Sequence, residues 1–94
     1  MSREVTLTGH LICEDAEQAQ RIAEALPAHV ALTRTEPGCL AFEVLRGDDP
    51  RTFTVAERFA DPAAFAAHQK RSAASDWALI SAGITRDYEI TGLP

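Results

Sequence analysis

Two strand-like segments joined by a turn lie in the middle of the chain, and they limit the folds open to it. Residues 39–46 (CLAFEVLR) and 52–59 (TFTVAERF) alternate apolar and polar side chains, which is the period of a half-buried strand. Residues 47–50 (GDDP) between them have the composition of a turn. The alternation also places Glu57 on the apolar face of the second strand. A β-sheet is therefore expected at the centre of the fold.

A strand and a helix precede this central pair. Residues 4–13 (EVTLTGHLIC) alternate like a strand, and Gly9 within them indicates a bulge or the close approach of another group. The acidic residues 14–15 then favour a helix start, and the Pro-Gly of residues 37–38 ends the helix. Because the apolar face continues in register past Pro27, we expect one kinked helix rather than two separate elements.

A second helix and a last strand follow the central pair. Asp61 and Pro62 have the residue types of an N-cap and a first helical position. A short further helix is expected to begin at Ser75 and to close at Gly83. Residues 84–91 (ITRDYEIT) alternate again and predict the last strand.

The resulting order, β-α-β-β-α-β, predicts an α+β fold of the ferredoxin-like kind. Right-handed crossovers turn this order into a four-stranded antiparallel sheet with both helices on one face. Residues 1–94 are expected to form a single domain of this kind. The uncovered sheet face is expected to be half apolar, which predicts a homodimer. The apolar residues assigned to that face are Ile12, Cys39, Ala41, Leu45 and Ala56.

Composition excludes several classes of function. A net charge of −5 with scattered basic residues argues against nucleic-acid binding. Two cysteines, Cys13 and Cys39, suit core positions, and three histidines on separate elements have no metal-ligand spacing. No apolar run is long enough to cross a bilayer and no signal core follows the N-terminus, so a cytoplasmic protein without a membrane partner is expected.

Three polar side chains are expected on core-facing positions. Glu57 and Arg86 lie among apolar neighbours on their strands, and buried charges need a partner. They are either a structural ion pair with its hydrogen bonds or a polar patch at the base of a ligand pocket between sheet and helices. His68 follows Phe65 by one helical turn and faces the same interior, either as a general base or as a histidine satisfied at the edge of the core.

The remaining candidates are aromatic. His29 could reach the same cleft, although its position also suits a solvated surface. Trp77 lies in a short, irregular segment and is a candidate pocket lid. The other aromatic side chains can all point inward, as core residues or cavity wall: Phe42, Phe53, Phe59, Phe65 and Tyr88. Motifs for nucleotide, flavin or common hydrolase sites are absent.

Residues 32–44 (LTRTEPGCLAFEV) and 53–69 (FTVAERFADPAAFAAHQ) resemble the antibiotic biosynthesis monooxygenase family. The match is carried by the E-P-G-C of residues 36–39, the strand with Glu57, the A-F-x-x-H of residues 64–68 and the closing R-D-Y-E-I strand. The resemblance covers nearly the full chain and implies a dimeric α+β barrel.

The resemblance also implies an activity, since some members oxygenate quinols or aromatic polyketides without flavin, haem or metal. The first hypothesis is therefore a cofactor-independent monooxygenase whose partners are a small aromatic substrate and O₂. His68 would accept the phenolic proton, and Arg86 and Tyr88 would hold the resulting anion. The proposed substrate-binding residues are Phe53, Phe59, Phe65, Trp77, Glu57 and His29.

Two other functions remain open. A non-catalytic dimeric barrel that binds a small aromatic metabolite would need the same cavity but no proton acceptor. An isomerase or lyase would need the same base but would consume no oxygen.

Haem degradation is not expected from the sequence. The haem-degrading enzymes of the same superfamily use an asparagine and an iron-binding histidine, but the first strand has no asparagine and residues 73–83 have no histidine.

Overall fold

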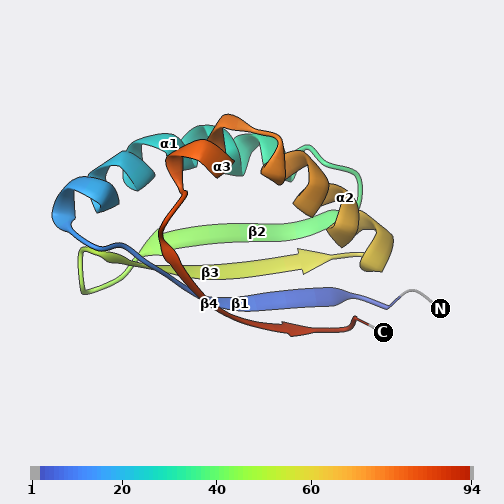
Figure 1. Cartoon of the computed structure of the whole chain (residues 1–94). Coiled ribbons are helices and arrows are strands. Elements are labelled where there is room, and N and C mark those ends of the chain that lie inside the picture. Colours follow the sequence, from blue (N-terminus) through green and yellow to red (C-terminus); the bar gives the residue numbers. More distant parts are fainter. Residues whose placement is uncertain (1–2, 94) are drawn as a thin grey trace.

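The structure, a computed structural model, describes residues 3–93 and contains one sheet with helices on one of its faces (Figure 1). The elements in chain order are β1 (Val5–Ile12), α1 (Ala16–Arg34), β2 (Cys39–Arg46), β3 (Thr52–Phe59), α2 (Pro62–Ala73), α3 (Asp76–Ile80) and β4 (Thr85–Thr91). The strand order is β2-β3-β1-β4, and all neighbouring strands are antiparallel. The predicted ferredoxin-like α+β fold is confirmed.

Strand β3 lies inside the sheet and follows the predicted alternation along its whole length. Phe53, Val55, Glu57 and Phe59 are buried, while the residues between them are exposed. In β1, Leu7 pairs with Glu57, and it belongs to the apolar core with Val5 and Leu11. The only charged group on this face of β3 is therefore enclosed by apolar neighbours.

Helix α1 begins directly after the acidic pair that the sequence predicts at its start, and Asp15 of that pair is its N-cap. Asp15 accepts a hydrogen bond from the Gln18 amide at 2.8 Å, and Gln18 Oε1 accepts one from the Glu14 amide at 2.7 Å. These two bonds satisfy backbone donors that a helix start leaves free. The helix runs through Pro27 as one element and ends at Arg34, three residues before the Pro-Gly pair that was expected to end it. The preference for one helix over two is confirmed.

Helix α2 has the predicted start and buries the predicted residues. Asp61 accepts a hydrogen bond from the Ala64 amide at 2.8 Å, and Pro62 occupies the first turn. Phe65 and His68 are the buried residues of this helix. The short helix α3 follows Ser75, and Gly83 adopts a φ of 87°, which favours glycine in the turn before β4.

One part of the sheet differs from the expected pattern. The pairing of β2 with β3 shifts register between Cys39 and Ala41, so that Leu40 is an extra residue. An inserted residue reverses the parity of the positions before it. As a result, Cys39 packs against the core and Leu40 is exposed, so the placement of Cys39 on the uncovered face was wrong.

Gly9 allows β4 to come close to β1. Its φ of 155° is rare for other residues, and a Cβ at this position would collide with the carbonyl oxygen of Asp87. The expected close approach at Gly9 is confirmed. Tyr88, the cross-strand partner of Gly9, is thereby brought over the helix-covered face.

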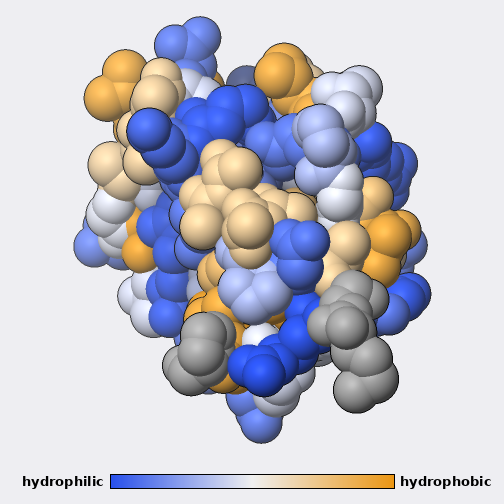
Figure 2. Space-filling view, turned by 90° about the vertical axis from the view of Figure 1, so that its right-hand side faces the viewer, coloured by the Kyte–Doolittle hydropathy of each residue, from blue (hydrophilic) through white to orange (hydrophobic). Residues whose placement is uncertain are grey.

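None of the helices within residues 3–93 combines the length and apolar character needed to cross a bilayer. At the end of the molecule near the chain termini, polar and apolar side chains are interspersed (Figure 2).

Candidate functional site

A cavity of about 120 Å³ lies between the sheet and the helices. Strands β1, β2, β3 and β4 form its floor, and α1, α2 and α3 contribute His29, His68 and Trp77. Six of the nine site residues expected from the sequence line this cavity: His29, Glu57, His68, Trp77, Arg86 and Tyr88. The folded chain therefore collects most of the candidates around one small space.

The three other candidates, Phe53, Phe59 and Phe65, are buried and are not among the lining residues of the cavity. The Phe59 ring stacks on the His68 ring with centroids 5.0 Å apart, and Phe65 meets Phe59 edge-on at 5.7 Å. Phe53 is buried under the Arg46 guanidinium, 5.2 Å from the ring centroid. Phe59 and Phe65 therefore support the His68 side of the cavity wall from the core, whereas Phe53 lines a separate groove beside Arg46.

His68 is held by a carboxylate that the sequence analysis did not select. Glu36 Oε1 lies 2.7 Å from His68 Nδ1, and Arg71 Nε donates to Glu36 Oε2 at 2.6 Å. Arg71 also donates to Thr33 Oγ1 at 2.9 Å, and Thr33 donates to the His29 carbonyl at 2.8 Å. Two signals pointed to this cluster: Glu36 belongs to the E-P-G-C motif, and Arg71 lies one helical turn after His68.

The contact with Glu36 determines which nitrogen of His68 is available for chemistry. A carboxylate accepts a hydrogen bond from Nδ1–H, which leaves the lone pair of the neutral imidazole on Nε2. Burial lowers the pKa of His68, and the hydrogen bond with Glu36 opposes that shift. Burial by itself would raise the pKa of Glu36, but hydrogen bonds from Arg71 and His68 outweigh it and lower the pKa. The arrangement suits an ionised Glu36 beside a neutral, oriented His68.

His29 is buried and stacks on Trp77, with ring centroids 4.5 Å apart and an angle of 10° between the planes. The solvated alternative for His29 was wrong, because α3 folds back over this face of α1. Burial, followed by the charges of His68 and Arg71, lowers the pKa of His29 to about 4. His29 is therefore neutral near pH 7.

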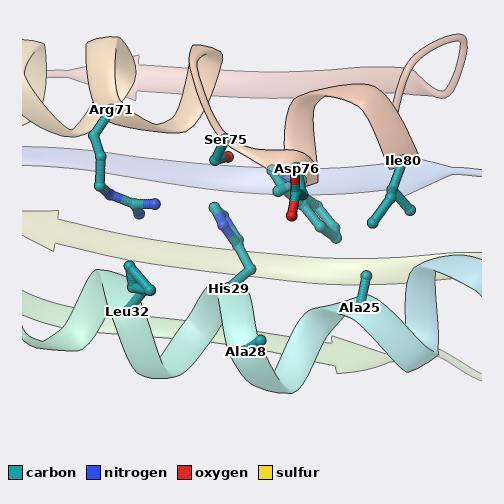
Figure 3. Close-up of a pocket in the computed structure, with 9 residues that line it drawn as sticks. Ala25, Ala28, His29, Leu32, Arg71, Ser75, Asp76 and Ile80 are labelled. Atoms are coloured by element: carbon teal, nitrogen blue, oxygen red, sulfur yellow. The ribbon is translucent and has the colours of Figure 1, made fainter.

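The His29–Trp77 pair separates the inner cavity from an outer groove of about 290 Å³. Figure 3 shows this groove, with Ala25, Ala28 and Leu32 on α1 facing Ile80 and Asp76 on α3. His29 and Trp77 line both spaces. A small displacement of their rings would join the inner cavity to the surface groove.

Glu57 is buried in the floor of the cavity, and its Oε1 atom has no hydrogen-bond partner among the described residues. Burial and the negative charge of Glu36 raise the pKa of Glu57 to about 7. Arg86 does not pair with it within residues 3–93, since the guanidinium donates instead to Ser81 Oγ at 2.8 Å. The ion-pair interpretation of Glu57 and Arg86 is therefore not supported, whereas both line the cavity.

Tyr88 and Arg86 lie on the edge strand β4 at the rim of the cavity. Burial raises the pKa of Tyr88 to about 12, so its hydroxyl keeps its proton at neutral pH. A neutral phenol and a guanidinium both donate hydrogen bonds, so this edge of the cavity can hold a ligand oxygen that carries negative charge. Within residues 3–93, no three His, Cys, Asp or Glu side chains are grouped as a metal site would require.

Comparisons with known proteins agree with the geometry. The sequence profile described as "Antibiotic biosynthesis monooxygenase" matches residues 15–78, a segment that includes Glu36, Glu57 and His68. No curated protein sequence matches the chain significantly.

Several solved structures share the fold over almost the whole chain. Protein PA3566 from Pseudomonas aeruginosa is 27% identical with a TM-score of 0.74, covering 99% of this chain and 94% of that one. A conserved protein of unknown function from Bacteroides thetaiotaomicron is 17% identical with a TM-score of 0.82, covering 99% of this chain and 100% of that one. SnoaB from Streptomyces nogalater, a cofactor-independent oxygenase, is 16% identical with a TM-score of 0.79, covering 98% and 94%.

Proposed function

Because this chain belongs to the antibiotic biosynthesis monooxygenase family, we propose that it is a cofactor-independent monooxygenase that oxidises a small quinol or polycyclic aromatic phenol in its inner cavity. The observation that carries the proposal is His68, which is buried on the wall of that cavity and whose Nδ1 contacts the partly buried Glu36 carboxylate. A pure binding protein has no need of an oriented proton acceptor at this place.

The chemistry requires the substrate to supply electrons. Ground-state O₂ is a triplet and reacts poorly with closed-shell molecules, whereas a phenolate can transfer one electron to it. The resulting superoxide and aryloxyl radical combine into a peroxide, which loses water and leaves a quinone. One oxygen atom thus enters the ring, and the other leaves as water with the ring hydrogen and the phenolic hydrogen.

His68 is the proposed base for the first step. Nε2 carries the lone pair, Glu36 holds the ring from the opposite nitrogen, and Phe59 supports one face of the ring. Once protonated, the imidazolium is stabilised by the Glu36 carboxylate, as in other carboxylate–histidine pairs. Arg86 and Tyr88 are the proposed donors to the phenolate oxygen.

The volumes of the inner cavity and of the outer groove limit the size of the proposed substrate. The inner cavity of about 120 Å³ is close to the volume of one aromatic ring, and a cavity of about 150 Å³ in another protein binds benzene. A polycyclic phenol would need the outer groove of about 290 Å³ as well, with the His29–Trp77 pair displaced. Together the two spaces fall within the usual range for small-molecule pockets, roughly 300–1,000 Å³.

A homodimer is part of the proposal. Helices cover one sheet face, and on the other face Ile12 and Leu45 are 40% and 56% exposed. Pairing of two such faces would bury these side chains. Light scattering after size exclusion tests this, since a monomer at micromolar concentration would contradict it.

The test of function is oxygen uptake by metal-stripped protein with a panel of quinols and anthrone-like phenols. We expect uptake without added cofactor, and a loss of about 10²–10⁴-fold in turnover for His68→Ala. Lys70→Ala is the matched control, because Lys70 lies on the same helix as His68 and is exposed. Equal turnover of His68→Ala and wild type would remove His68 from the mechanism.

The same panel separates the alternative functions. Tight binding without oxygen uptake would favour a binding protein. Conversion of an enolisable substrate without oxygen uptake would favour an isomerase or lyase.

A further inference from the structure

Two buried polar side-chain atoms in residues 3–93 lack a hydrogen-bond partner, and both belong to residues of the inner cavity wall. They are Glu57 Oε1 and His29 Nδ1. Glu57 is 7% exposed and His29 is 8% exposed, so bulk water does not solvate them. Buried polar groups without a partner are rare in folded proteins, and each needs a physical explanation.

The location of Glu57 makes its missing partner informative. Its cross-strand neighbours on the same face are Leu7 of β1 and Phe42 of β2, which offer no polar group. Arg86, the cationic side chain on the cavity wall, donates to Ser81 instead. The protein therefore leaves a carboxyl group facing the cavity without neutralising it, although a leucine would pack there at lower cost.

We propose that Glu57 is a specificity-determining residue that hydrogen-bonds a second oxygen of the substrate, so that the cavity selects arenes with two oxygen substituents over simple phenols. The inference rests on the proposed function, in which His68 binds the first hydroxyl. Glu57 then donates its own proton to the second oxygen, which in a diol can also donate in return. Glu57 thus donates a hydrogen bond to one oxygen of the ring, whereas His68 accepts one from the other oxygen.

The protonation state of the groups around Glu57 supports its role as a donor. Burial and the charge of Glu36 raise the pKa of Glu57 to about 7, so the neutral carboxyl predominates below that pH. His29, with a pKa lowered to about 4 by burial, and His68, whose pKa burial also lowers, do not compete for that proton near pH 7. The titratable or charged groups that line the cavity with Glu57 are His29 of α1, His68 of α2, and Arg86 and Tyr88 of β4. Glu36 and Cys39 interact with Glu57 from outside the lining. Strands β1 and β2 and helix α3 present Leu7, Phe42 and Trp77.

The binding test uses phenol, catechol and hydroquinone, which fit a one-ring cavity and differ by one hydroxyl or its position. Trp77 is the only tryptophan and lines the cavity, so its fluorescence reports binding, with titration calorimetry as a second readout. Titrations are carried out without oxygen, so that binding is measured independently of turnover. Wild type is expected to bind at least one diol about 5–100-fold more tightly than phenol.

Glu57→Leu removes the proposed hydrogen bond. This variant is therefore expected to bind the diol and phenol with about equal affinity. Glu57→Gln keeps a neutral donor and should retain most of the preference. Wild-type affinity for the diol should fall as the pH rises through about 7, whereas that of Glu57→Gln should not change there. Glu17→Gln, on the exposed face of α1, is the matched control.

A stability measurement excludes a purely structural role. Without ligand, Glu57→Leu is expected to raise Tm by about 4 °C or more, because it removes an unpartnered carboxyl. A residue kept for the fold would lower Tm when replaced. An unchanged diol preference in Glu57→Leu, or no diol preference in wild type, would overturn the inference.

Failure of this inference and failure of the proposed function are distinguishable. Oxygen uptake together with an unchanged diol preference in Glu57→Leu would support the proposed oxygenase function and contradict the specificity role of Glu57. A diol preference that depends on Glu57, without oxygen uptake with any substrate of the panel, would support the binding role of Glu57 and contradict the proposed oxygenase function.

Discussion

Two carboxyl groups near one small cavity have opposite environments, Glu57 on the cavity floor and Glu36 behind the lining residue His68. Glu36 accepts hydrogen bonds from His68 and Arg71, and these bonds lower its pKa against the effect of burial. Glu57 has an unpartnered oxygen, and burial raises its pKa to about 7. Environments that separate the pKa values of two like groups also separate their chemical roles. The Glu36 end of the site is therefore already organised by hydrogen bonds, whereas the Glu57 end keeps an unpartnered oxygen that the proposed substrate would bind.

The difference follows from where each residue lies in the fold. Glu36 follows the end of α1, in a connection from which its side chain reaches two residues of α2. Glu57 lies in the middle of β3, a central strand whose neighbours turn apolar side chains toward it. A loop end allows a carboxylate to find donors, whereas a central strand holds it where the sheet places it.

The largest effect is expected from breaking the organised end. Glu36→Ala leaves the buried His68 and the half-buried Arg71 without their shared partner, so we expect the free energy of unfolding to fall by about 3–5 kcal/mol. Urea denaturation measures this. Glu17→Ala, which removes an exposed ion pair with Arg21, should cost about 0.5 kcal/mol or less. Equal costs for the two variants would contradict the comparison.

The pH dependence of the free energy of unfolding tests the environment of Glu57. The folded-state pKa of Glu57 is about 7 and its ordinary value is 4.5, so the folded state keeps a proton that the unfolded state has lost between these values. Stability from this group is fully present below pH 4.5 and is lost as the pH rises through about 7. From pH 4.5 to above 7, wild type should lose about 3 kcal/mol relative to Glu57→Gln.

The comparison with Glu57→Gln is needed because His29 has the opposite effect. Its pKa of about 4 lies below the ordinary 6.5, so its contribution to stability is present above pH 6.5 and is lost toward pH 4. In wild type the two trends oppose each other, whereas the difference between wild type and Glu57→Gln isolates the carboxyl. A difference that stays constant with pH would show that Glu57 is ionised in the folded protein throughout.

The smallest effect concerns the geometry of the organised end. Arg71→Lys keeps the positive charge but not the paired contacts with Glu36 and Thr33, so we expect a loss of about 1 kcal/mol. Arg21→Lys on the exposed face of α1 is the matched control, and thermal unfolding is the measurement. If Arg71→Lys lowers the stability no more than the control does, the positive charge of residue 71 is sufficient to stabilise Glu36 without the paired contacts.

Much of the fold could be predicted because it depends on local patterns. The period of β3, the acidic start of α1 and the N-cap at Asp61 are properties of short segments, and the structure confirms them. The bulge at Leu40 could not be predicted, because it depends on how β2 registers against β3. Gly9 was an intermediate case, since its residue type indicated a close approach but not the identity of the approaching strand.

The candidate site could be predicted only in part. Helical and strand periods place His68 and Glu57 on interior faces, and both are buried there. The stack of His29 on Trp77 and the contact of Glu36 with His68 join segments separated by more than thirty residues, and no period relates such positions.

By itself, the sequence determined the order of the elements and the face of each element on which a side chain lies. The reason is that backbone periods of two and 3.6 residues relate a side chain to its own strand or helix. The tertiary structure alone decided which side chains meet across elements, and therefore which carboxyl group is paired and which keeps its proton. Protonation depends on burial and on distances to charges from other elements, and these exist only after the helices have packed on the sheet.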